Sequence, residues 1–149
     1  MIKSESEYQA CLKRLKGDQA TIRKQRSELI KLGLSADQLE KALQPLFSFK
    51  DQLQEEIDRY EQVQRRDFHP LKNLSGFGQL LIATRIALGL SQKELASRLG
   101  VDVSQVSRDE RNEYHGISIE RAEKVLQALK VDLISKIEFP ANEHELVHE

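Results

Sequence analysis

The sequence predicts a mainly all-α protein: an antiparallel helical hairpin, then a domain of short helices, with a possible short strand near the C-terminus. Two long segments carry apolar residues at alternating spacings of three and four, and a later segment carries helix caps at short intervals. The stretch RDFHPLKNLSGFG, residues 66 to 78, interrupts the two regions with helix-breaking residues. We therefore expect a hairpin at 1–66, a linker at 67–77, a helical domain with a C-terminal extension at 78–140, and a polar tail at 141–149.

The composition restricts the class of protein. Among 149 residues, 32% are charged and 5% aromatic, with no tryptophan and a net charge of −1, which is typical of helix-rich chains. No apolar run is long enough to span a membrane, and MIKSESEYQ lacks the apolar core of a signal peptide. Cys11 stands alone, so a disulfide framework and a thiolate metal cluster are excluded. We expect a cytoplasmic protein with no cofactor, no metal and no membrane contact.

The hairpin is predicted from its caps and from two matching apolar seams. Ser4 with Glu7 and Ser35 with Gln38 have the spacing of capping boxes, and Gly33 lies where the first helix should end. A chain reversal there brings the following pairs together: Leu29 with Leu39, Ile22 with Leu46, Leu15 with Leu53, and Tyr8 with Tyr60. Both seams then match without adjustment.

The first hairpin helix is basic, and this run resembles a DNA-binding arm. Its members are Lys13, Arg14, Lys16, Arg23, Lys24, Arg26 and Lys31. The acidic second helix explains the run better, because the reversal places Lys13, Arg14 and Lys16 opposite Asp51, Glu55 and Glu56.

Pro45 should disturb the second hairpin helix. A proline inside a helix removes a backbone hydrogen bond, so we expect either a kink or a break near Gln44–Pro45. Two helices alone leave apolar surface uncovered, including Ile30, Leu32, Phe47 and Phe49. A second copy of the chain is the simplest cover, which predicts a homodimer.

Two short helices are predicted in SQKELASRLGVDVSQVSRDER, residues 91 to 111. Ser91 with Glu94 starts a helix over 92–99, and Gly100 ends it. Asp102 with Gln105 has the spacing of another capping box and starts a helix that reaches about Arg111. Apolar-faced helices precede this pair, ending at Gly89, and follow it, over 118–129. This is the layout of a helix-turn-helix, in which the second helix enters the DNA major groove.

The segment from about Gly78 to Leu129 resembles the Cro/CI-like (XRE) helix-turn-helix family of bacterial and phage regulators. The similarity lies in ATRIALGLSQKELASRLGV, SQVSRDER and SIERAEKVLQAL, about a third of the chain. The resemblance implies a lambda-repressor-like fold that binds double-stranded DNA. Asp109 departs from the family pattern, in which this position is usually apolar or aromatic.

The resemblance also implies site residues. Gln92 matches a glutamine that braces a DNA phosphate and the recognition helix, and Arg85 with Glu110 matches a structural ion pair. The positions that match base-contacting ones are Asp102, Val103, Ser104 and Arg108. An arginine can donate to guanine O6 and N7, which makes Arg108 the strongest candidate for base reading. We add Lys93, Gln105, Ser107 and Arg111 to the predicted DNA surface, with Arg98 as a further candidate for a phosphate contact.

The C-terminal part of the chain carries two further patterns. VDLISKIEF, residues 131 to 139, alternates apolar and polar positions and favours a strand over a short helix capped by Asp132. HELVH, residues 144 to 148, matches the letters of a zinc-protease signature, but no third ligand follows it, and a polar tail is the better interpretation.

The patterns together predict a DNA-binding regulator and not an enzyme. We expect a repressor that binds a palindromic operator as a homodimer. The alternative is a protein-binding module whose hairpin captures a partner, with DNA binding for autoregulation. A helical segment before such a domain, and the phrase DQLQEEIDRYE, resemble HigA-type antitoxins, which implies a toxin as that partner.

Overall fold

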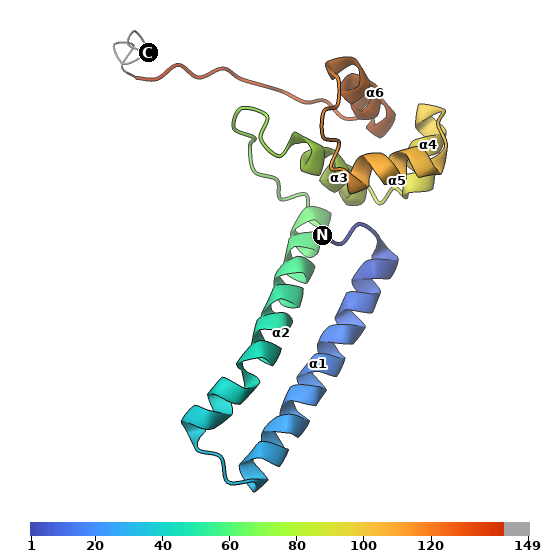
Figure 1. Ribbon diagram of the computed structural model, residues 1–149. Helices are drawn as coiled ribbons and strands as arrows, with labels where there is room; N and C mark the ends of the chain where they lie inside the picture. The colour runs from blue at the N-terminus through green and yellow to red at the C-terminus, as the bar shows by residue number, and fades with distance from the viewer. Residues whose placement is uncertain (142–149) are drawn as a thin grey trace.

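The structure is a computed structural model that describes residues 1–141, and over this range it is all-helical (Figure 1). The helices are α1 (Glu5–Lys31), α2 (Ala36–Gln64), α3 (Phe77–Ala87), α4 (Gln92–Leu99), α5 (Val103–Arg111) and α6 (Ile119–Leu129). Figure 1 shows α1 and α2 as a long antiparallel pair, which we call the stalk, and α3 to α6 gathered above it, which we call the head. The predicted all-α class is confirmed.

The stalk is held by its predicted caps and seam. The Ser4 hydroxyl accepts from the Glu7 amide, and Ser35 and Gln38 form the full reciprocal box. Gly33, at φ 81°, takes the left-handed conformation that ends α1. The rings of Tyr8 and Tyr60 stack with centroids 4.8 Å apart, as the seam register predicts.

Of the two outcomes expected at Pro45, the kink is the one observed: α2 is one helix from Ala36 to Gln64, and Figure 1 shows its lower end bent relative to the rest. The opposite charges of the two helices do not form ion pairs between Lys13, Arg14 or Lys16 and the acidic side chains of α2. Arg14 pairs instead with Asp18, one turn further along its own helix, at 3.8 Å.

The head has an apolar core to which all four of its helices contribute. Among its buried members are Leu81, Ile82, Leu95, Val106, Val125 and Leu129. Gly78 allows the tightest approach, because a Cβ there would lie 1.7 Å from the carbonyl oxygen of Glu113. This glycine lets α3 pack against the loop that follows α5.

The first residues join the stalk to the head. Ile2 is buried, and it belongs to one core cluster with Leu15 and Tyr60 of the stalk and Ile86 of the head. Lys3 contributes polar contacts described below. The N-terminal segment therefore belongs to both units.

Residues 131–140 form neither the predicted strand nor the rival helix. They run out from α6 as an extended segment, with Ile134, Ile137 and Phe139 more than 80% exposed. A strand requires a partner edge for its backbone groups, and the described part of this chain offers none. The HELVH stretch at 144–148 lies outside the described residues.

None of the helices in residues 1–141 is long and apolar enough to cross a membrane.

Candidate nucleic-acid interface

The two short helices meet as a helix-turn-helix. Ser91 and Glu94 form the predicted reciprocal box at the start of α4, and Gly100, at φ 68°, ends that helix. Asp102 caps α5 by accepting from the amide of Ser104 at 2.8 Å. The predicted box with Gln105 is not formed, because the Gln105 side chain donates to Asp109 one turn later. The prediction of Asp102 as the cap residue is confirmed, and the predicted reciprocal bond from Gln105 is not.

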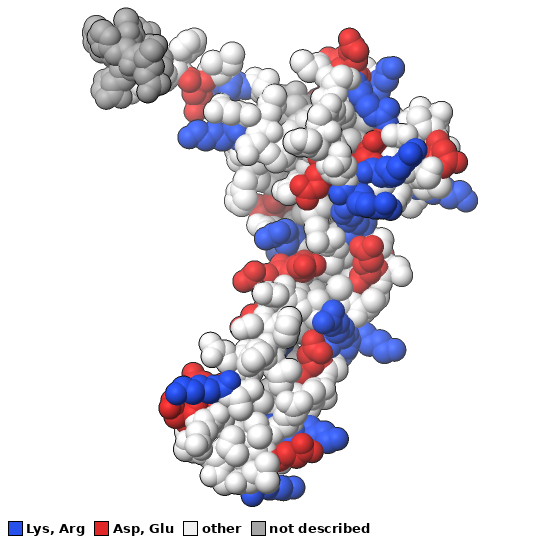
Figure 2. Space-filling view, viewed as in Figure 1, with Lys and Arg blue, Asp and Glu red and all other residues white. Residues whose placement is uncertain are grey.

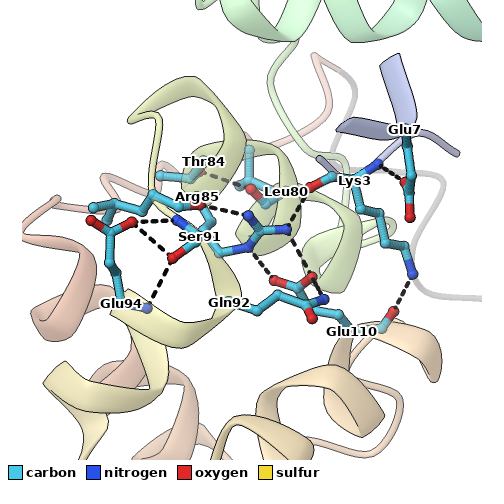
Figure 3. A network of polar contacts seen from close by, with 10 residues as sticks. Lys3, Glu7, Leu80, Thr84, Arg85, Ser91, Gln92, Glu94 and Glu110 are labelled. Atoms are coloured by element: carbon cyan, nitrogen blue, oxygen red, sulfur yellow. Dashed lines mark hydrogen bonds and ion pairs between the residues drawn. The ribbon is translucent and has the colours of Figure 1, made fainter. Parts of the chain in front are cut away.

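A buried polar network fixes the orientation of α5 (Figure 3). Arg85 of α3 donates to both carboxylate oxygens of Glu110, with Nη2 2.9 Å from Oε2, and the Glu110 side chain is fully buried. The Gln92 amide of α4 donates to the same Oε2 at 2.7 Å. Arg85 also donates to the Leu90 carbonyl at 2.6 Å, which fixes the turn before α4.

The N-terminal segment completes this network. Arg85 Nη2 donates to the carbonyl of Lys3 at 3.0 Å, and Lys3 Nζ donates to the backbone oxygen of Glu110 at 2.9 Å. In the described residues no buried side-chain nitrogen or oxygen lacks a hydrogen-bond partner. A fully satisfied network of this kind rigidifies its surroundings, so it holds α3, α4, α5 and the start of the stalk as one body.

The opposite side of α5 is presented to solvent. Val106 and Glu110 are buried beneath the helix, whereas Val103, Ser104, Arg108 and Arg111 are exposed. Gln105 and Ser107 are half-buried at the edges of this surface. The Arg108 guanidinium is held by Gln105, with Nη2 3.1 Å from Oε1. This surface has the side chains that a helix in the major groove uses for base contacts.

Gln92 and Lys93 lie at one border of that surface. They line an open groove of about 680 Å³ with Ser107 and Arg111 of α5, and with Lys3 and Ser4 at the start of the stalk. Gln92 is engaged with Glu110 through its amide nitrogen, so it braces α5 directly. The groove thus brings together candidates predicted on two helices and adds Lys3, which the sequence did not indicate.

Asp109 explains how α5 is attached to α6 without the usual apolar residue. Its carboxylate forms an ion pair with Arg121 of α6 at 2.6 Å and accepts from Gln105. Arg98 is also used within the head, since it donates to the backbone oxygen of Ala128 at 3.0 Å. It is therefore a weaker candidate for a phosphate contact than Lys93 or Arg111.

The two cap carboxylates are held in their charged forms. Hydrogen bonds from Ser104 keep the pKa of Asp102 below its ordinary value, and hydrogen bonds from Ser91 do the same for the pKa of Glu94. Each acid lies at a helix N-terminus, where negative charge is stabilising. Each carboxylate accepts hydrogen bonds at the start of its own helix and thereby stabilises that helix.

Comparison with known proteins gives one family match, and it covers part of the chain. Residues 81–135 match a family model described as helix-turn-helix. No curated protein and no solved structure matches the chain. The matched range starts within α3, covers α4 to α6 and extends into the segment that follows α6.

Proposed function

We propose that this chain, whose residues 81–135 match a helix-turn-helix family model and resemble the Cro/CI-like (XRE) regulators, is a transcriptional repressor that reads a near-palindromic operator as a homodimer. The family match supports a DNA-binding regulator. The repressor role, the operator symmetry and the dimer are our inference.

The observation that carries the proposal is the exposed side of α5 above its buried anchor. Arg108 has a guanidinium suited to guanine O6 and N7, and Val103 and Ser104 can contact a thymine methyl or another base edge. Gln92, Lys93, Ser107 and Arg111 border this surface, where the DNA backbone would pass. The Glu110 network keeps the helix rigid, which limits the entropy lost on binding.

The dimer follows from DNA geometry and from exposed apolar residues. Two half-sites lie about 34 Å apart, one helical turn, so two recognition helices must be held at that separation. The half of the stalk far from the head exposes Ile30, Leu32 and Phe49 by 55%, 76% and 61%. In a dimer paired through the stalk, these side chains would be removed from water. Pairing through the stalk would link two weak DNA sites at high effective concentration.

The same residues support the second candidate, capture of a different protein by the stalk. A toxin bound there would make the chain antitoxin-like, with DNA binding for autoregulation. The two candidates differ in the state of the isolated protein: the first requires a dimer in solution, and the second permits a monomer that dimerises or assembles only with its partner.

Selection from a random duplex library, followed by footprinting on the promoter of the protein's own gene, tests the function. We expect a selected sequence with two-fold symmetry and a protected region of the same sequence. Recovery of unselected sequences at every round would contradict sequence-specific binding.

A further inference from the structure

We propose that a basic stripe on α1, formed by Lys13, Lys16, Arg23, Lys24 and Lys31, is a second DNA-binding site that contacts backbone phosphates outside the half-site read by α5. This inference rests on the proposed DNA-binding function and extends it to the stalk. The family match covers residues 81–135 and does not include the stripe, which lies on the stalk and outside the head.

The first argument is the state of these side chains. All five are exposed, and none of them forms an ion pair or a hydrogen bond in the structure. The sequence had suggested that the acidic residues of α2 neutralise this run, but no ion pair joins the basic side chains of α1 to α2. Unpaired cations on a stable helix are free to meet phosphates.

The second argument is their arrangement. At 100° a residue, the five positions fall within about a third of the helix circumference, away from the Leu15 and Ile22 seam. Asp18 falls on another side of α1, whereas Glu28, one turn after Lys24, borders the stripe. Figure 2 shows Lys and Arg side chains on the α1 side of the stalk and on the part of the head above it, with Asp and Glu side chains between them.

The third argument is the position of the stripe relative to the candidate interface. α1 starts at the groove that Lys93 and Arg111 line, and Glu5 of its first turn lines the same groove. Arg23 follows Glu5 by 18 residues, five whole turns, and so lies on the same side of α1. At 1.5 Å a residue, Lys13 to Lys31 lie about 12 to 39 Å beyond Glu5, a span of about 27 Å against about 34 Å for one turn of duplex.

The fourth argument is charge. From 13 to 31, α1 holds seven basic and two acidic residues, a net charge of +5, whereas the head from 77 to 129 holds seven of each and is neutral. Phosphate neutralisation supplies most of the sequence-independent affinity of a DNA-binding protein. The head offers local contacts such as Lys93 and Arg111 but has no net positive charge, and the stripe would add further cations.

The test compares two full-length variants with the same loss of charge. The stripe variant carries Lys16→Gln, Arg23→Gln and Lys24→Gln; the control carries Lys41→Gln, Lys72→Gln and Lys136→Gln, three exposed lysines on α2, the linker and the C-terminal segment. Glutamine is a good helix former, so both should keep the wild-type circular dichroism and melting curve. The probe is a fluorescent 40-base-pair duplex of random sequence, titrated at several salt concentrations.

Loss of three phosphate contacts should reduce the magnitude of the slope of log K against log salt by about 2.7. We expect a decrease of about two to three and at least a tenfold loss of affinity for the stripe variant, against a slope change below one for the control. Equal slopes for the two variants would overturn the inference. A weakened dimer in sedimentation velocity, with DNA binding unchanged, would also overturn it and assign the stripe to the acidic α2 of a second copy.

The outcomes separate this inference from the proposed function. If the wild-type protein binds no duplex even at low salt, both fail. If it binds and Arg108→Ala changes its sequence preference while the stripe variant behaves like the control, only the second site fails.

Discussion

Arg85 of α3 and Glu110 of α5 form a buried bidentate ion pair, and the same guanidinium donates to the backbone oxygen of Lys3. Their side chains are 3% and 0% exposed. One residue therefore connects α3, α5 and the start of the stalk. The surface of α5 that we propose to face DNA and the start of the stalk are held by the same side chain.

Removing one member of this pair should destabilise the head strongly. Arg85→Ala leaves the Glu110 carboxylate buried without its cation, which costs about 3–5 kcal/mol in typical proteins. Urea unfolding followed by circular dichroism measures the change. The matched control is Arg121→Ala, which breaks the partly exposed pair with Asp109 and should cost at most about 1 kcal/mol. Similar midpoints for Arg85→Ala and the wild type would contradict the structural role of the pair.

Arg108→Ala should reduce sequence discrimination without changing stability. The side chain is exposed and makes its polar contact only with Gln105 of its own helix, so the fold does not depend on it. Loss of one bidentate base contact costs about 1–3 kcal/mol of discrimination at one base position. Competition between selected operator and random duplex measures this, with Lys41→Ala on the stalk as the control. An equal loss on both duplexes would mean that Arg108 meets only phosphate.

Two glycine-to-alanine changes should have opposite effects. At Gly78 a methyl group would overlap the backbone of Glu113, so Gly78→Ala should lower the melting temperature and loosen the loop after α5. At Gly17, inside α1, nothing lies within 4 Å of the added carbon, and Gly17→Ala should stabilise the helix by about 1 kcal/mol. Differential scanning calorimetry of both variants checks the pair. A stable Gly78→Ala protein would show that α3 and the loop can separate without cost.

The cap of α5 should weaken in acid. Hydrogen bonds from Ser104 lower the pKa of Asp102 in the folded state, so its stabilising effect is complete above the unfolded pKa and is lost as pH falls through the folded pKa. Asp102→Asn keeps a good cap but cannot titrate. The melting temperature of the wild type relative to Asp102→Asn should therefore fall as pH decreases below about 4. A difference that does not vary with pH would contradict a charged cap.

Local signals in the sequence were sufficient for most of the helices and for much of the candidate interface. Capping residues such as Ser35 and Ser91, and the left-handed glycines Gly33 and Gly100, act on their own neighbours, so a short stretch determines the end of each helix. The register of the stalk was also predictable, because Tyr8 and Tyr60 belong to seams that match only one way.

Several other contacts between segments distant in the sequence could not be predicted. Nothing near Lys3 indicates that its carbonyl accepts from Arg85, 82 residues away. Asp109 departs from the family pattern, and nothing in the sequence indicates that Arg121 of α6 forms an ion pair with it. The opposite charges of α1 and α2 do not lead to ion pairs between the basic side chains of α1 and α2, because charge of the right sign does not fix a long side chain in place, and exposed pairs contribute little. The strand at 131–139 needed a partner edge that residues 1–141 do not contain.

Assembly through the stalk can be tested without disturbing the head. Deleting residues 1–66 would also remove Ile2 and Lys3, which contact the head, so the sharper change is Ile30→Gln, Leu32→Gln and Phe49→Gln in the full chain. If these residues cover one another in a homodimer, sedimentation equilibrium should show a monomer, and operator affinity should fall because the two DNA sites are no longer linked.

The control replaces three exposed apolar residues elsewhere, Leu74→Gln, Ile119→Gln and Ile134→Gln, and should stay dimeric. The stalk variant keeps the buried seam at Leu15, Ile22, Leu43 and Ile57, so its helical content should not change. A stalk variant that remains dimeric and binds the operator as tightly as the wild type would assign the exposed apolar residues to another protein. The capture of a partner by the stalk, as in an antitoxin, would then become the stronger interpretation.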